Sequence, residues 1–352
     1  MEVIALERRL LCRTWNLKMA VTCEGHVYSA GTLLGASFPP IEEIIEGMFI
    51  AGRSSVIGGA YGIGKTTLAI QMGAGLAAGE PIFCRTVARS YRVGYFDLEL
   101  GAAEFQVRLR LAMTRIQNTE ILDKNFIYVD ASSESDLFGR IKLQPDASDW
   151  LLADLICDQR IEIAIIDNVS LAVLGDLSEP QVCMELHRNL GLLRRKAPTL
   201  KLPILPAHLV KPSRENALPS LLKEPRGWLA GIRGSGKLLD HITQRFGFDL
   251  EHESEREYYV LNGISSHKLI SPLVLEQDLE TRQFRVSTDQ EMNRSVIFTP
   301  AEQKVWDALL KRFRYADIKK HGGSSYRMFK KAQEHRLITE VESGTWEKAL
   351  DG

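Results

Sequence analysis

The sequence predicts an α/β fold, with a mostly parallel β-sheet covered by helices on both faces and a small module towards the C-terminus. Three observations lead to this prediction. Strand-like and helix-like segments alternate from Ile41 to His208, which is typical of parallel sheets. A glycine-rich loop joins the first of these strands to a helix at Lys65. A separate helical pattern begins at Thr299.

Strands are expected at short apolar runs, and helices where apolar residues recur every three to four positions. The expected strands lie at residues 54–58, 92–98, 126–130, 162–166 and 203–208, and the expected helices at residues 65–78, 102–116, 148–157 and 180–195. Continuous apolar runs such as residues 163–166 are typical of central, buried strands. Beyond Asp240, short alternating segments at residues 257–260, 268–274 and 283–286 predict antiparallel hairpins that close one edge of the sheet.

These patterns divide the chain into an N-terminal extension (residues 1–36), a core (37–287), a polar linker (288–298) and a C-terminal module (299–352). The module begins with a capping-box pattern, in which Thr299 is followed by Pro300 and then by Glu302. Two more helical segments and a strand–turn–strand pattern follow, at residues 315–320, 324–335 and 337–345. This order predicts a winged-helix-like module.

The composition is that of an ordinary globular protein, with 352 residues, 45% hydrophobic and 25% charged, and a net charge of −1. No segment approaches the ~20 apolar residues of a membrane span, and the N-terminus lacks a signal-peptide pattern. We therefore expect a cytoplasmic protein with no membrane partner. The five cysteines are scattered, which predicts buried apolar side chains rather than a zinc site or disulfides.

Residues Gly59 to Thr66, with the sequence Gly-Ala-Tyr-Gly-Ile-Gly-Lys-Thr, match the Walker A pattern in full. Glycines let backbone N–H groups approach phosphate, and the start of the following helix adds donors and a favourable dipole. Lys65 is expected to neutralise the outer phosphates, and Thr66 to bind Mg²⁺ through its hydroxyl. The residues expected to hold the nucleotide are Gly59, Ala60, Tyr61, Gly62, Ile63, Gly64, Lys65, Thr66 and Thr67. The sequence therefore predicts a site for ATP and Mg²⁺.

Carboxylates end two of the expected strands, at the edge of the sheet where open α/β folds bind ligands. Glu99 is well placed to orient and deprotonate the attacking water, with Asp97 as the competing candidate. The apolar run that ends in Asp167 has the Walker B pattern and is expected to deliver a carboxylate to Mg²⁺. Asn168 can hydrogen-bond beside it. Asp130 is a rival for the Walker B role, at the end of a more polar strand.

His208 ends the next strand and is followed by a basic segment. Its side chain could sense the γ-phosphate, or it could simply be a histidine that is bonded to backbone carbonyls. The candidate DNA contacts in the basic segment are Lys211, Arg214, Lys223 and Arg226, and those on the expected helix at residues 324–335 are Arg327, Lys330 and Lys331. Charge runs are usually solvated faces, so these remain candidates.

The ordered set of these motifs resembles the RecA/DnaB-type P-loop core, most closely that of the plasmid RepA-type hexameric replicative helicases. The resemblance covers roughly residues 36–260 and includes Arg233-Gly234-Ser235-Gly236-Lys237. It implies that Glu99 is the catalytic base, that His208 couples ATP to DNA, and that the following loops line a central pore. It also implies that Arg233 reaches the γ-phosphate of a neighbouring subunit, a role that Lys237 could share at the nucleotide.

The first functional hypothesis is therefore an ATP-hydrolysing DNA helicase or translocase that works as a homo-oligomeric ring, expected to be a hexamer, with single-stranded DNA in its central channel. The alternative is an ATP-switched DNA-binding regulator or loader without unwinding activity, in which the C-terminal module finds duplex sites. A small-molecule kinase is disfavoured because the sequence shows no arginine-rich lid or acceptor pocket.

Overall fold

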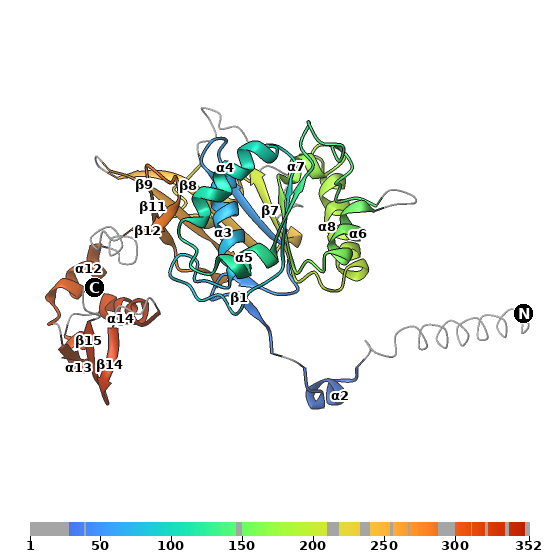
Figure 1. The fold of residues 1–352 in the computed structure, drawn as a ribbon. Coiled ribbons are helices and arrows are strands. Elements are labelled where there is room, and N and C mark those ends of the chain that lie inside the picture. Colours follow the sequence, from blue (N-terminus) through green and yellow to red (C-terminus); the bar gives the residue numbers. More distant parts are fainter. Residues whose placement is uncertain are drawn as a thin grey trace, which may run out of the picture. The chain divides into compact units, whose positions relative to one another are not determined.

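The computed structural model describes residues 28–38, 40–145, 150–209, 218–232, 240–253, 256–266, 268–287, 300–310, 312–320, 323–334 and 338–348. The chain divides into two compact units, Met1–Ile41 and Glu42–Gly352. The larger unit contains the α/β sheet, and Figure 1 shows the order of its elements along the chain.

A ten-stranded sheet forms the centre of the larger unit within the described residues. Its strands are β3 (Ser55–Gly59), β4 (Val93–Asp97), β5 (Phe126–Asp130), β6 (Ile163–Asp167), β7 (Leu202–His208), β8 (Gln244–Glu253), β9 (Arg256–Ser265), β10 (Lys268–Leu269), β11 (Leu273–Gln277) and β12 (Phe284–Val286). Their order is β12-β11-β9-β8-β3-β7-β6-β4-β5, with β10 paired to β9. Strands β5, β4, β6, β7, β3 and β8 are parallel, and β9 to β12 are antiparallel. The predicted mostly parallel sheet with an antiparallel edge is confirmed.

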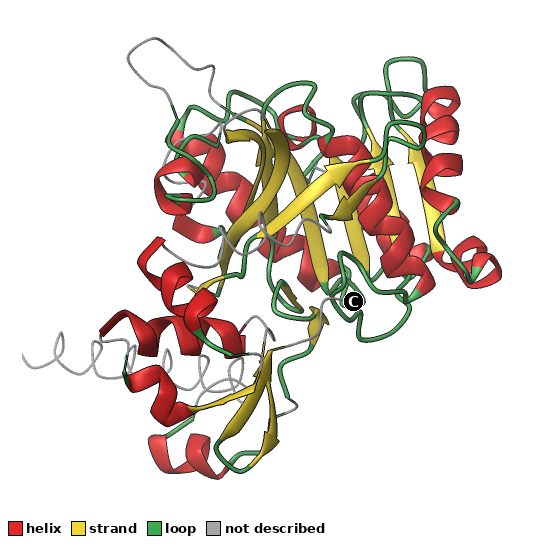
Figure 2. Ribbon diagram, turned by 90° about the vertical axis from the view of Figure 1, so that its left-hand side faces the viewer, coloured by secondary structure: helices red, strands yellow, loops and turns green. Residues whose placement is uncertain are grey.

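Helices cover both faces of this sheet, as Figures 1 and 2 show. One face carries α3 (Lys65–Ala78), α4 (Ala102–Met113) and α5 (Thr119–Asn125), together with the small hairpin of β1 (Glu43–Ile45) and β2 (Phe49–Ile50). The other face carries α6 (Leu151–Asp158), α7 (Val169–Ala172), α8 (Pro180–Lys196) and α9 (Pro225–Leu229).

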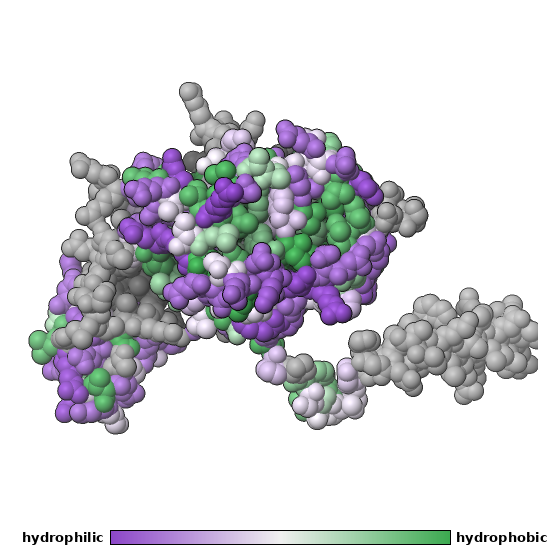
Figure 3. Space-filling view, viewed as in Figure 1, coloured by the Kyte–Doolittle hydropathy of each residue, from purple (hydrophilic) through white to green (hydrophobic). Residues whose placement is uncertain are grey.

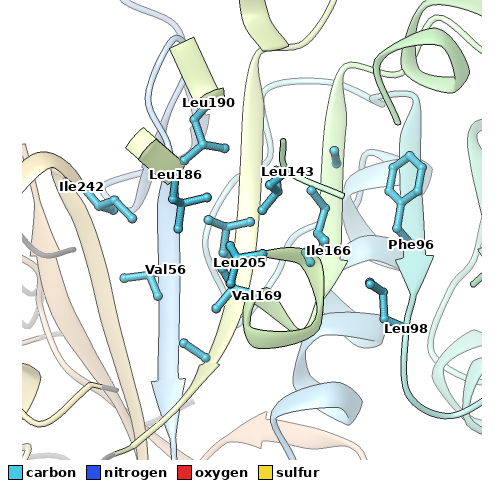
Figure 4. Close-up of a cluster of buried hydrophobic side chains, with 14 of the residues drawn as sticks. Val56, Phe96, Leu98, Leu143, Ile166, Val169, Leu186, Leu190, Leu205 and Ile242 are labelled. Carbon is cyan, nitrogen blue, oxygen red and sulfur yellow. The ribbon is translucent and has the colours of Figure 1, made fainter. Parts of the chain in front are cut away.

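Side-chain alternation along the strands separates the two cores. Val56 belongs to the core under α8, whereas the next residue, Ile57, belongs to the core under α3. Figure 4 shows Leu186 and Leu190 of α8 reaching towards Val56, with Ile242 beside them. The continuous apolar strands that the sequence predicted are therefore buried on both faces.

Two sequence predictions need correction. Strand β8 was not predicted, because its ten residues mix glutamine, arginine and acidic side chains with aromatic ones. It pairs with β3 on one side and with β9 on the other, so this pairing, and not an apolar run in its sequence, makes the segment a strand. The expectation of buried cysteines is wrong for Cys84, which is exposed; Cys157 is half-buried and Cys183 is buried. Cys12 and Cys23 lie outside the described residues.

The C-terminal module has a core of its own, which includes Trp306, Phe313, Met328 and Phe329. Its elements are α12 (Pro300–Ala308), β13 (Arg312–Arg314), α13 (Tyr315–Lys319), α14 (Gly323–Glu334), β14 (Ile338–Glu342) and β15 (Thr345–Lys348). The three strands form a sheet in the order β13-β15-β14. The predicted helices are present, whereas β13 was not predicted. Thr299 and the linker lie outside the described residues.

The smaller unit contains helix α2 (Ala30–Gly35), whose first turn is capped by the Ser29 hydroxyl accepting from the Thr32 N–H at 3.2 Å. Leu33 and Leu34 of this helix are exposed, and Figure 3 shows hydrophobic side chains on its surface. Among all the residues that the structure describes, no helix combines the length and the apolar composition that crossing a membrane requires.

Candidate functional site

The Walker A residues form a tight loop between β3 and α3. Gly62 and Gly64 have φ angles of 75° and 101°, in the left-handed region that favours glycine. A Cβ atom on Gly64 would also lie 2.9 Å from the ring of Phe284, so a side chain here would clash. Helix α3 begins at Lys65, as predicted, and its first backbone N–H groups lack partners within the helix. The loop therefore has the shape and the donors of a phosphate site.

Lys65 folds over this loop. Its Nζ donates to the carbonyl oxygens of Gly59 at 2.9 Å and Ala60 at 2.8 Å, and it lies 3.4 Å from Nδ1 of His208. Burial lowers the pKa of Lys65 to about 8, although the negative charges of Asp167 and Glu99 partly oppose this shift. The ammonium is thus held where an incoming phosphate could replace neutral carbonyl acceptors with a charged one.

Asp167 ends β6 and is almost fully buried. Its carboxylate accepts a hydrogen bond from the Tyr95 hydroxyl at 2.7 Å and is also bonded to Thr66. Burial raises the pKa of Asp167, and the hydrogen bonds from Tyr95 and Thr66 act in the opposite direction. A hydroxyl and a carboxylate side by side are the oxygen donors that Mg²⁺ prefers, with phosphate oxygens and water completing its shell. Thr66 and Asp167 therefore fit a magnesium ion bound with a nucleotide.

Glu99 is exposed just beyond the end of β4, and its Oε2 accepts from Nδ2 of Asn168 at 2.8 Å. Asn168 is buried, and its Oδ1 accepts from the Ser170 N–H at 3.0 Å, which fixes the orientation of the amide. The same Nδ2 lies 3.4 Å from Nε2 of His208. With the Lys65 contact, a continuous chain of side chains runs from the phosphate loop through His208 and Asn168 to Glu99.

Strand register explains this convergence. Gly59 of β3 pairs with His208 of β7, and Asp97 of β4 pairs with Asp167 of β6. All four residues end parallel strands, so they meet at one edge of the sheet. The sequence predicted this edge correctly, but it did not predict that Asn168 joins Glu99 to His208.

The two rival carboxylates have other roles. Both oxygens of Asp97 are occupied: they accept from the Glu99 N–H at 3.0 Å and from the Tyr128 hydroxyl at 3.0 Å, among other donors. Asp97 therefore shapes the loop that carries Glu99. Asp130 ends the edge strand β5, where it accepts from the N–H and the hydroxyl of Ser132 at 3.0 and 2.7 Å. Both carboxylates are thus engaged by donors of the fold itself.

A cavity of about 310 Å³ adjoins the phosphate loop and was not predicted from the sequence. Tyr259 contributes an aromatic ring that stacks on Phe248 at 5.5 Å, and its hydroxyl lies 3.3 Å from Oε1 of Gln277. The residues lining the cavity are Gly62, Ile63, Gly64, Thr67, Arg108, Leu111, Tyr259, Gln277, Thr281, Arg282 and Gln283. Its volume and its flat polar groups fit a nucleobase attached to phosphates in the loop.

The structure does not describe all of the predicted site residues. Lys211, Arg214, Arg233 and Lys237 lie outside the described residues. Tyr61 is 85% exposed at the tip of the phosphate loop, and its ring centroid lies 6.0 Å from that of His208.

The remaining candidate DNA contacts differ among themselves. Lys223 and Arg226 are exposed at the start of α9. On α14, Arg327 and Lys330 are exposed as well. Lys331 instead donates to the buried carboxylate of Glu302 at 2.7 Å, so its charge is compensated within the module. Lys331 is therefore a weaker candidate than its two neighbours.

One comparison with known proteins agrees with the phosphate loop. Residues 27–197 match the sequence model of a family described as an AAA domain. No curated protein sequence matches the chain. Among solved structures, the chain is similar to a KaiC-like protein from the hyperthermophilic archaeon Pyrococcus horikoshii, at 14% sequence identity and a TM-score of 0.45; the match covers 70% of this chain and 100% of the other. The AAA domain match and the phosphate loop together support a P-loop ATPase core.

Proposed function

We propose that the protein hydrolyses ATP with Mg²⁺ and uses this hydrolysis to move along DNA as a ring-shaped helicase or translocase. The observation that supports ATP hydrolysis is the row of contacting side chains that runs from Lys65 through His208 and Asn168 to Glu99. It supports the proposal that Lys65 is the cation for the outer phosphates and Glu99 the carboxylate for the attacking water. Phosphoryl transfer requires little more of a protein than this positioning and charge stabilisation.

Each residue of the site has a physical role in this proposal. Backbone N–H groups of the phosphate loop and the Lys65 ammonium bind the β- and γ-phosphates. Thr66 and Asp167 would hold Mg²⁺, which would supply positive charge against the phosphates. Glu99 accepts a proton from water in line with the γ-phosphate, and Asn168 keeps its carboxylate turned towards the site.

His208 is the proposed link between ATP and DNA. Its ring touches both Lys65 and Asn168, and it is followed directly by the segment that contains Lys211 and Arg214. A change in phosphate occupancy at Lys65 would alter the contacts of His208, and the segment that follows could respond. Together with the resemblance to hexameric helicases, this supports single-stranded DNA as the partner.

In the ring, Arg233 would reach the γ-phosphate of the neighbouring subunit, and Lys237 could assist it. This predicts that Lys65→Ala and Arg233→Ala are each inactive alone, but that mixing them restores activity at interfaces with an intact loop on one side and an intact arginine on the other. In a random equal mixture about a quarter of the interfaces are of this kind. ATP hydrolysis of each variant and of the mixture is the measurement. A mixture as inactive as its components, or an active monomeric Arg233→Ala protein, would exclude the shared site.

The second candidate function is an ATP-switched DNA-binding regulator or loader. The observation in its favour is that the C-terminal module has its own core and exposes Arg327 and Lys330 on α14, as a winged-helix reading helix would. A forked DNA substrate separates the two functions. Strand separation that requires ATP and Lys65 supports the helicase, whereas duplex binding without unwinding supports the regulator.

A further inference from the structure

A cluster of basic side chains lies at the opposite end of β3 from the phosphate loop. It consists of Arg53, His187, Arg194, Arg226, His241 and Arg245, called here the basic cluster. Arg53 and Ser54 directly precede β3. Arg245 is the second residue of β8, the parallel neighbour of β3, and His241 lies shortly before that strand. Parallel strands begin at one edge and end at the other, so this edge is distinct from the ATP site.

The fold brings these residues together through specific contacts. His187 and Arg194 are seven residues apart on α8, two turns along the same face. Arg194 donates from Nη2 to the Ser54 hydroxyl, which joins the end of α8 to the start of β3. The rings of His187 and His241 stack with centroids 4.4 Å apart. Ile242, the residue after His241, packs against α8 beside Leu186 and Leu190, as Figure 4 shows.

The cluster gathers like charges that are only partly compensated. Burial, followed by repulsion from Arg53, lowers the pKa of Arg194. Burial and Arg226 have the same effect on the pKa of Arg245, and Asp240 is the carboxylate that opposes it. Bringing like charges together costs folding free energy, so such a cluster indicates a function that needs the charge.

Exposed side chains of the cluster can contact phosphate directly. Arg53 and Arg226 are exposed, and a guanidinium presents its donors as a planar fork that matches two oxygens of a phosphate. The rings of His187 and His241 are exposed as well and add a flat face on which a base can stack. The cluster therefore combines net positive charge, exposed guanidinium donors and a stacking face.

We propose that the basic cluster binds the phosphodiester backbone of nucleic acid, as a second phosphate-binding surface at the edge of the sheet remote from ATP. The cations come from α8, α9, β8 and the entry to β3, so they extend over more than one phosphate group. This inference rests on the proposed action on DNA and adds a surface that the candidate contacts after His208 do not include, apart from Arg226.

The test is the binding of a fluorescein-labelled single-stranded oligonucleotide to the full chain, followed by fluorescence anisotropy over a series of salt concentrations. The cluster variant Arg53→Gln with Arg226→Gln removes two exposed charges. The matched control is Arg188→Gln with Arg195→Gln, which removes two exposed charges from α8 outside the cluster. The cluster variant is expected to bind at least about tenfold more weakly and to lower the slope of log K against log salt by about 1.4, at ~0.7 per phosphate contact. The control should stay within about twofold of the parent.

Two results would overturn the proposal. If both double variants weaken binding equally, the effect is general electrostatics and the cluster has no special role. If the parent binds polyglutamate as tightly as the oligonucleotide, and both are lost in the cluster variant, the surface serves an acidic protein segment. The same titration with a duplex of the same sequence shows whether the surface binds single-stranded or double-stranded DNA.

The outcome is separable from that of the proposed function. A chain that hydrolyses ATP but whose cluster variant binds the oligonucleotide as the parent does contradicts this inference alone. A chain that fails to hydrolyse ATP, but loses oligonucleotide binding when the cluster is changed, contradicts the proposed function and leaves this surface in place.

Discussion

Asn168 joins the two halves of the candidate ATP site through one side chain. Its Nδ2 holds Glu99 at 2.8 Å and approaches His208 at 3.4 Å, while its Oδ1 is anchored to the N–H of Ser170. Glu99 itself is exposed, so without this contact its carboxylate could adopt several rotamers. Positioning of the base is therefore expected to depend on a residue that never touches the nucleotide.

Substitution of Asn168 by alanine is expected to lower kcat for ATP hydrolysis about tenfold to a hundredfold and to leave the Kd for ATP nearly unchanged, because Glu99 loses its orientation. Steady-state kinetics and nucleotide binding are the measurements. The matched control is Asn118→Ala, since the Oδ1 of Asn118 accepts from the Ile121 N–H at 3.3 Å and caps α5, the helix that precedes β5. The control should lose about 1 kcal/mol of stability with kcat unchanged. If both variants lost kcat equally, the loss would come from the missing helix cap and not from the orientation of Glu99.

Lys65 gives the site a predictable response to pH. Its pKa is lowered to about 8 by burial, against the opposing charges of Asp167 and Glu99. Below about pH 8 the ammonium is charged and attracts phosphate; above it, the proton is lost and the attraction with it. The value of kcat/KM for ATP reports the free protein, so it is expected to fall as the pH rises from about 8 to 10 and to vary little just below this range. A constant kcat/KM up to pH 10 would show that Lys65 keeps its charge.

At the scale of the elements, helix α9 is fixed to the sheet by Trp228. This side chain is fully buried, and its Nε1 donates to Asp249 of β8 at 2.6 Å. Gly247, two residues earlier on β8, leaves the space that the indole ring fills, because a Cβ atom there would lie 2.4 Å from Cζ3 of Trp228. The position of α9, and with it Arg226, therefore depends on a glycine in the strand.

The substitution Gly247→Ala is expected to lower the free energy of unfolding by about 1–3 kcal/mol, since Trp228 must move from a tightly packed position. Urea unfolding of the full chain is the measurement. The control is Gly191→Ala in the interior of α8, where an added Cβ would meet no heavy atom within 4 Å. The same change there should raise stability by about 0.5–1 kcal/mol, because alanine favours the helix. If both variants were equally stable, Trp228 would not be closely packed against Gly247.

The elements that the sequence predicted share one property: their patterns are local. The strands at Val93 and Ile163 are continuous apolar runs, and α3 follows a glycine-rich loop with known geometry. Strand β8 was missed because its polar residues take their places from pairing with β3 and β9, which a single segment does not reveal.

The site shows the same division. Lys65, Thr66 and Asp167 follow from motif and strand end, and the structure brings them together as expected. The contact of Asn168 with Glu99 and the cavity at Tyr259 depend on how strands are ordered and aligned, so the sequence could not specify them. The separation of roles between Asp97 and Glu99 likewise rests on backbone donors that only the folded loop presents.

At the scale of the whole core, the sheet separates two charged surfaces. The ends of the parallel strands collect Lys65, Asp167 and Glu99, and the beginnings of β3 and β8 collect the basic cluster. We propose that ATP is hydrolysed at one edge of the sheet and that nucleic acid binds in part at the opposite edge. The parallel strands and the helices over both faces, visible in Figures 1 and 2, provide the rigid connection between them.

The central claim is that the residues at the first edge form a site for Mg²⁺-dependent ATP hydrolysis, with Glu99 as the base. The most direct measurement compares ATP binding and turnover of the parent and of Glu99→Gln, with and without Mg²⁺. The parent is expected to turn over ATP only with Mg²⁺, whereas Glu99→Gln should still bind ATP with Mg²⁺ but hydrolyse it about 10²–10⁴ times more slowly. Turnover by Glu99→Gln at the parental rate, or a parent that does not bind ATP with Mg²⁺, would contradict the central claim.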